Sequence, residues 1–171
     1  TLGGDGRLWV TLNRPFGEEP FGRVPWRGFA LAIEPSDGSW QPVCAGLRSP
    51  CGLERAPWGD VFYTDNQGEW CGASKLARLA PGSFHGHPWG IESTTLPEWR
   101  YGAVPLPPNQ TLMPEVEKTI PSFELPAVWF PYDEMGRSPA GFVWDGAGHF
   151  GPFFERHLLV GDQFDASLIR V

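Results

Sequence analysis

The sequence has few cysteines and no long apolar run. Its three cysteines, Cys44, Cys51 and Cys71, include no Cys-x-x-Cys pair, and a zinc site would need four closely spaced ligands. The sequence therefore predicts buried or partly buried free thiols, or else one disulfide with a third thiol left over. Because no apolar stretch approaches the roughly 20 residues that a membrane span needs, no transmembrane segment is predicted.

The sequence also lacks clustered positive charge. Its 13 Lys and Arg residues form no run, and 20 Asp and Glu residues bring the net charge to -7. Nucleic-acid binding depends on clustered cations, so the composition argues against a nucleic-acid partner. The first six residues contain neither an initiator Met nor a signal peptide, and the last predicted strand reaches Val171. We therefore expect a segment of a longer chain.

Glycine and proline are abundant, and so are aromatic residues. The 22 glycines and 19 prolines make up about a quarter of the chain, a fraction that can indicate disorder. Nine Trp and twelve Phe residues are more than a disordered segment carries. Short strands joined by many turns fit this composition better than helices do.

Apolar segments between turn signals predict a series of short strands. The expected strands cover 7–12, 28–33, 40–47, 60–66, 75–79, 127–130, 141–144, 157–160 and 167–171, and 48–53 is expected as a turn into a further short strand. The segments DGRLWVTL, WGDVFYTDN and FERHLLVGD have the pattern of equivalent strands in successive units. Units that cannot bury their faces alone and stack around an axis form a β-propeller. The sequence thus predicts an all-β, partial propeller.

Residues 89–125 interrupt this pattern. They hold six prolines and little periodicity. We interpret them as a Pro-rich insertion, or long surface excursion, within a single domain over 1–171, with one helical turn near 114–118. A loop of this length is usually functional or partly ordered.

A cluster of polar residues follows the strand at 60–66. Asp65, Asn66 and Gln67 stand at its end, and Gly68 permits a close approach or a positive φ. These side chains could line a central site, or the Asx residues could cap a turn. Arg48 could bind a carboxylate bidentately or could pin loop carbonyls.

Two further sets of residues are candidate metal ligands. His85 and His87 would point to one side of an extended segment, as a metal pair or as structural or site-wall histidines, although no third ligand lies nearby in the sequence. Glu69 and Asp162 carry the hard oxygens that calcium prefers, or are solvated loop acids.

The segment 47–88, LRSPCGLERAPWGDVFYTDNQGEWCGASKLARLAPGSFHGHP, resembles the glucose/sorbosone dehydrogenase family. The shared pattern is Arg-x-Pro-x-Gly-Leu, a strand, a Gln-Gly turn, a polar loop and a Gly-x-x-x-Gly-x-Pro exit. The segment 150–171 resembles a later blade. The resemblance covers nearly all of the chain except about 89–125. It implies about half of a six-bladed propeller with four-stranded antiparallel blades, similar to large bacterial proteins that often add a c-type haem domain.

The resemblance also implies a cofactor site. Arg48 and Ser49 would contact pyrroloquinoline quinone (PQQ), and Gln67 would lie beside it. Backbone carbonyls of Gly68 and Glu69 would help to hold calcium. The catalytic base of the family is a histidine in an earlier blade, outside this sequence, so no catalytic residue is assigned.

Several positions depart from the family pattern. Ser49 stands where the family more often has Asn, and Phe164 stands where a quinone-binding Lys is expected. Ala73, Ser74 and Lys75 replace a stretch that carries acidic residues in the enzymes.

The resemblance leads to a functional expectation with two alternatives. The parent protein would oxidise a sugar or alcohol by hydride transfer to PQQ, in the periplasm or outside the cell, and this segment alone would be inactive. Alternatively, the chain is a non-catalytic propeller that binds carbohydrate or a protein partner, or a purely structural propeller domain.

Overall fold

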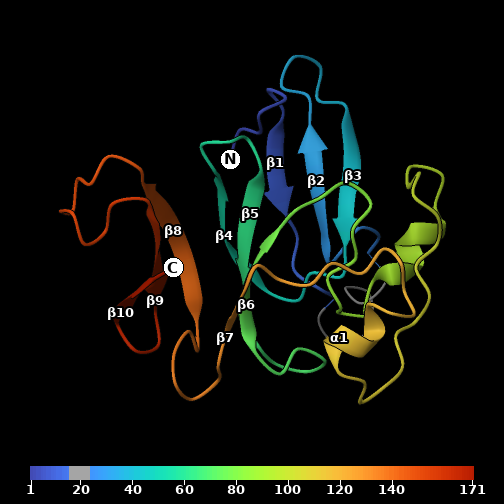
Figure 1. The fold of residues 1–171 in the computed structure, drawn as a ribbon. Helices are drawn as coiled ribbons and strands as arrows, with labels where there is room; N and C mark the ends of the chain where they lie inside the picture. The colour runs from blue at the N-terminus through green and yellow to red at the C-terminus, as the bar shows by residue number, and fades with distance from the viewer. Residues whose placement is uncertain (16–23) are drawn as a thin grey trace.

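The computed structural model describes residues 1–15 and 24–171, and it contains three antiparallel sheets (Figure 1). The first sheet has the order β1-β2-β3, the middle sheet β4-β5-β6-β7 and the third β8-β9-β10. The strands are β1 (Leu8–Thr11), β2 (Phe29–Ile33), β3 (Trp40–Ala45), β4 (Pro50–Arg55), β5 (Val61–Asp65), β6 (Ser74–Arg78), β7 (Val128–Phe130), β8 (Pro139–Asp145), β9 (His157–Asp162) and β10 (Ser167–Arg170). The expected strands are therefore confirmed.

The predicted four strands per blade occur only in the middle sheet of the described chain. The first and third sheets have three strands each. A repeated turn shows which strands are equivalent in neighbouring sheets. Strand β3 and strand β7 each lead to an Arg-Ser-Pro turn, at 48–50 and 137–139, so β1–β3 correspond to β5–β7. In the same way β8–β10 match β4–β6.

Apolar side chains fill the spaces between neighbouring sheets. One cluster joins the first and middle sheets, with Cys44 and Tyr63 both fully buried. A second cluster joins the middle and third sheets through Leu76, Phe130 and Val160. The sheets thus pack face to face, as stacked propeller blades do, and Figure 1 shows them side by side.

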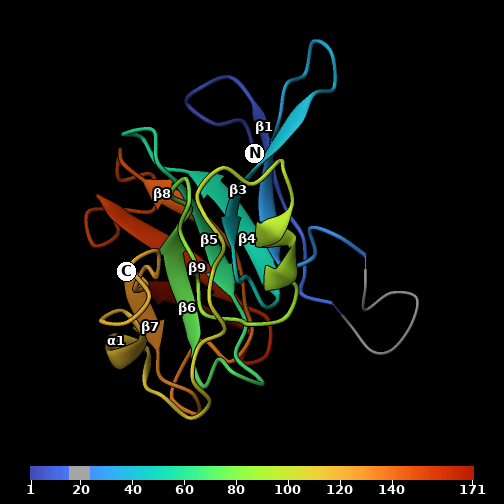
Figure 2. The ribbon, with the colours of Figure 1, turned by 90° about the vertical axis from the view of Figure 1, so that its right-hand side faces the viewer.

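The excursion at 89–125 packs on the first sheet instead of extending freely. It contains a 3-10 helix, η2 (Ile91–Thr95), and a single helical turn, α1 (Met113–Val116), close to the predicted position. Its apolar side chains cluster around Phe29 and Ala45 of the first sheet. Backbone bridges pair Phe84 with Ala45 and with Phe123, so both ends of the excursion are held together. In Figure 2 the excursion faces the viewer, in front of the strands.

All three cysteines are free, which confirms free thiols over the disulfide alternative, although Cys51 is exposed and not buried as expected. Cys44 and Cys71 are buried, and burial raises the pKa of both thiols. Among the described residues, no helix has both the length and the apolar character to cross a membrane. Residues 14–25, which the sequence predicts as a loop rich in proline and glycine, lie partly outside the described residues.

Candidate functional site

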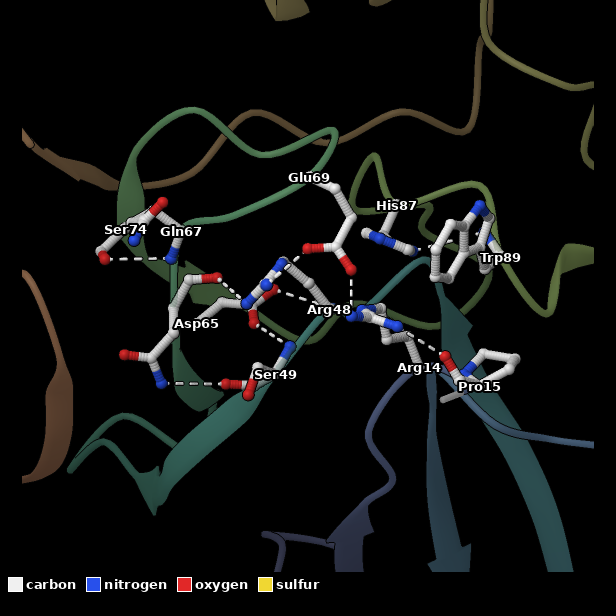
Figure 3. Close-up of polar contacts among 11 residues, drawn as sticks. Arg14, Pro15, Arg48, Ser49, Asp65, Gln67, Glu69, Ser74, His87 and Trp89 are labelled. Carbon is white, nitrogen blue, oxygen red and sulfur yellow. Dashed lines mark hydrogen bonds and ion pairs between the residues drawn. The ribbon is translucent and has the colours of Figure 1, made fainter. Parts of the chain in front are cut away.

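Asp65 fixes the turn that carries two of the predicted cofactor residues. It is the last residue of β5 and is almost completely buried. Its carboxylate accepts hydrogen bonds from the backbone N–H of Ser49 at 2.6 Å and of Arg48 at 3.1 Å. These contacts place the turn between β3 and β4 directly against the end of β5. The predicted Arg48, Ser49 and 65–67 cluster is therefore brought together (Figure 3).

Lys75 stands behind Asp65 as a buried cation. Its Nζ lies 3.8 Å from Asp65 Oδ2 and donates a 2.6 Å hydrogen bond to the carbonyl of His85. Burial raises the pKa of Asp65, and the charge of Lys75 and the two backbone donors offset this only in part. Lys75 thus supports the site from within the fold, a role that the sequence did not reveal.

Arg48 crosses the site and contacts the loop after β5. Its Nη1 donates to the carbonyl of Asn66 at 3.3 Å, and its Nη2 lies 2.7 Å from a carboxylate oxygen of Glu69. Arg48 therefore pins a loop carbonyl, as one interpretation of the sequence predicts, and its Nε is buried without a partner within the described residues.

Glu69 bridges two arginines. One of its oxygens contacts Arg48, and the other contacts Arg14, a residue that sequence reasoning missed (Figure 3). Burial alone would raise the pKa of Glu69, but the hydrogen bond from Arg48 and the charges of both arginines hold the pKa below its usual value. Arg14 also donates to the carbonyl of Pro15 at 2.7 Å and lies 4.6 Å from the centre of the Trp89 ring.

Gly68 lets this loop approach Arg48 closely. A β-carbon at Gly68 would overlap the Arg48 guanidinium, and the residue has a φ of 154°. Its N–H donates to the carbonyl of Cys71 at 2.7 Å, and its own carbonyl accepts from Cys71 N–H at 3.0 Å. The predicted need for glycine here is confirmed by this contact.

The two histidines occupy separate buried environments. His87 Nδ1 accepts from Trp89 N–H at 3.3 Å, and its Nε2 is buried with no partner among the described residues. Burial and the charge of Arg14 lower the pKa of His87 to about 3, so the ring is neutral. His85 Nε2 lies 2.9 Å from the hydroxyl of Ser83, and burial together with Lys75 lowers its pKa well below the usual value.

The remaining predicted residues have less defined roles. Gln67 N–H donates to Ser74 Oγ at 3.1 Å, and Asn66 Nδ2 donates to the carbonyl of Ser49 at 3.2 Å. Asn66 therefore caps the turn. Asp162 accepts from three backbone N–H groups, which fills its carboxylate with structural contacts.

The Gly68 carbonyl and the Glu69 carboxylate do not fit a calcium site. Both oxygens of Glu69 contact guanidinium groups, and the Gly68 carbonyl accepts from Cys71 N–H. A calcium ion there would stand beside two fixed cations, whereas calcium needs several oxygen ligands with negative charge. Within the described residues, no group of three His, Cys, Asp or Glu side chains is placed to hold a metal.

The third sheet repeats the turn that carries Arg48. Arg137, Ser138 and Pro139 precede β8, as Arg48, Ser49 and Pro50 precede β4. Backbone N–H groups of Arg137 and Ser138 donate to Asp162 at 3.0 and 3.1 Å, just as the first pair donates to Asp65. The two turns are thus structural copies in adjacent sheets.

Solved structures share this architecture. An aldose sugar dehydrogenase from Streptomyces coelicolor in its PQQ-bound form matches 99% of this chain with a TM-score of 0.59 and 16% identity. An oxidoreductase from Thermus thermophilus, described as a glucose dehydrogenase, matches 99% with a TM-score of 0.60 and 19% identity. Both are β-propeller dehydrogenases.

The chain folds as part of a β-propeller. The identities support the fold and not a function for this chain. The chain spans 42% and 45% of the length of these two proteins, as the predicted partial propeller requires. No family model and no curated protein matches the sequence.

Proposed function

We propose that this partial propeller supplies part of the PQQ site of a sugar or alcohol dehydrogenase. The observation that carries the proposal is the convergence of Arg48 and Arg14 on one point between the first and middle sheets. PQQ is a planar tricarboxylate, and the guanidinium fork matches carboxylate geometry. The buried Arg48 Nε, which has no partner on the described chain, is a donor that such a ligand would satisfy.

Each residue has a proposed task at this site. Arg48 binds a carboxylate of the quinone, Ser49 presents its hydroxyl beside it, and Gln67 offers its side-chain amide to the ring. Asp65 holds the turn so that Arg48 points into the site. When bound, the quinone supplies the hydride acceptor for sugar oxidation. We propose no role for calcium at the Gly68 carbonyl and the Glu69 carboxylate, because the first accepts a backbone hydrogen bond and the second contacts two arginines.

The test is a calorimetric titration of PQQ into the intact protein and its Arg48→Ala variant. Loss of a buried charge partner at a binding site costs about 2 kcal/mol or more, so we expect affinity to fall at least about 30-fold. Arg78→Ala is the matched control, because Arg78 is exposed and pairs with Asp60 and Glu124 on the surface. Equal affinity in Arg48→Ala and the unmodified protein would contradict the proposal.

One observation favours the non-catalytic alternative. A groove of about 350 Å³ lies between the loop after β5 and α1, with Trp70 and Trp129 in its wall. Exposed indoles beside small residues can stack on sugar rings. If PQQ does not bind the intact protein, titration with oligosaccharides tests this carbohydrate-binding function.

The family resemblance extends the proposal to the protein's surroundings. We propose a periplasmic or extracellular location, and a c-type haem domain of the parent chain as electron acceptor. Haem-stained gels of the periplasmic fraction test both together.

A further inference from the structure

Three segments of the chain meet at one carboxylate. Glu69 lies in the loop between β5 and β6, Arg14 follows β1, and Arg48 precedes β4 (Figure 3). The side chains of Arg14 and Arg48 are only 10% and 16% exposed, whereas that of Glu69 is 35% exposed. The two cations are therefore the buried partners and the carboxylate is the outer one.

The arginines are anchored independently of Glu69. Arg48 donates to the Asn66 carbonyl, and Arg14 donates to the Pro15 carbonyl and stacks over Trp89. Glu69 lies in a tight turn closed by the Gly68–Cys71 backbone pair, outside the strands. Moving Glu69 outward would therefore leave both guanidinium groups in place.

The position of Arg14 has a counterpart in the other sheets. Arg14 follows Thr11 of β1 by three residues, Gln67 follows Thr64 of β5 by three, and both come directly after an Asn. Phe164 follows Gly161 of β9 by the same interval. Arg14 thus occupies, on the first sheet, the place that Gln67 occupies on the middle sheet.

We propose that Arg14 and Arg48 form a two-guanidinium site for a carboxylate ligand, and that Glu69 is its internal occupant until a ligand carboxylate replaces it. For PQQ as the ligand, this inference rests on the proposed function, but the site would also accept simpler dicarboxylates. His87 supports it: its ring lies beside Glu69, and its buried Nε2 is a further unsatisfied group that a ligand oxygen could pair with (Figure 3).

The test measures binding of pyridine-2,6-dicarboxylate, a planar aromatic dicarboxylate, and of PQQ to the intact protein by calorimetry. Glu69→Gln removes the competing charge, so we expect dicarboxylate affinity to rise about 10-fold or more. Arg14→Gln removes half of the site, so affinity should fall at least 10-fold. Glu115→Gln, an exposed glutamate paired with Lys118, makes the same charge change elsewhere and should alter affinity less than 2-fold.

Three results would overturn this inference: no binding of the dicarboxylate to Glu69→Gln, no gain in Glu69→Gln over Glu115→Gln, or unchanged affinity in Arg14→Gln. If Arg14→Gln does not fold, Arg14→Lys keeps the charge without the fork and should still bind more weakly. PQQ binding that depends on Arg48 but not on Arg14 or Glu69 would preserve the proposed function and refute the inference. If Glu69→Gln tightens dicarboxylate binding but PQQ does not bind, the inference is supported and the proposed function is refuted.

Discussion

At the scale of single residues, the site depends on how closely a backbone can approach a guanidinium group. Gly68 lies against Arg48 with no room for a β-carbon, whereas a β-carbon on Gly72, four residues later in the same loop, would meet open space. The loop therefore has one glycine that geometry requires and one that it does not. This contrast separates the effect of crowding at Arg48 from the general effect of a stiffer loop.

We expect Gly68→Ala to destabilise the protein by about 1–3 kcal/mol, because Arg48 must move or the backbone must be strained. Gly72→Ala should change stability by less than about 0.5 kcal/mol. Urea unfolding followed by tryptophan fluorescence measures both. Similar losses of stability in the two variants would mean that the Arg48 side chain moves easily, which contradicts a guanidinium group held in a fixed position.

Residue-level reasoning from the sequence found part of this site. The family resemblance marked Arg48 and Ser49 through their turn motif, but it marked Glu69 as a calcium ligand and not as the partner of two arginines. Arg14 was not predicted, since its contact with Glu69 joins residues far apart in the sequence. A signal was present: Thr11-Leu12-Asn13-Arg14 parallels Thr64-Asp65-Asn66-Gln67. Lys75 looked like a departure from a family pattern, and only its burial beside Asp65 shows its structural role.

At the scale of strands and turns, the same carboxylate-to-turn contact occurs twice in the chain. Asp65 and Asp162 each end the second strand of the motif and each accept the backbone N–H groups of an Arg-Ser pair. The copies differ in what lies behind the carboxylate. Asp65 has the buried Lys75, whereas the turn at Asp162 carries the partly exposed Arg137. Strand positions were predictable because the alternation of apolar and polar residues is local. The charge of Lys75 beside Asp65 was not predictable, because it depends on how the folded chain packs.

We expect Asp65→Asn to destabilise the protein by about 3–5 kcal/mol, because Lys75 would be left as a buried charge without its carboxylate. Asp162→Asn should cost only about 1–2 kcal/mol, since it mainly weakens backbone hydrogen bonds. Adding Lys75→Met to Asp65→Asn should recover part of the loss. Equal effects of the two Asp variants, measured by urea unfolding, would rule out a special role for Lys75.

At the scale of the whole molecule, stability is tied to groups buried at the junction of the first and middle sheets with the excursion. His85 and His87 lie there, both fully buried, with pKa values lowered chiefly by burial. The folded protein thus keeps both rings neutral under conditions in which the unfolded chain takes up protons. The excursion also contributes to this core, because apolar residues between its prolines pack on the first sheet.

Stability should therefore fall as the pH drops below about 6.5, where histidines of the unfolded chain bind protons. Because the histidine pKa is lower in the folded state, the contribution of each histidine to stability is fully present above pH 6.5. This contribution is lost as the pH falls towards the folded-state pKa, which is about 3 for His87. Between pH 6.5 and 5, each histidine should remove about 1.5 kcal/mol. His87→Gln should remove the contribution of one histidine from this pH dependence. An unchanged slope in His87→Gln contradicts the assignment.

The backbone bridges that join Phe84 to Ala45 and to Phe123 have a consequence for engineering the chain. They close the excursion at its base, so lengthening the excursion leaves the order of the strands unchanged. Residues 108–110 are exposed, and Leu106 just before them is turned to solvent. Because the entropy of a closed loop grows only slowly with its length, a foreign peptide or reporter domain spliced into this exposed stretch would lengthen an already closed loop at small cost. The propeller sheets would then serve as a scaffold for display.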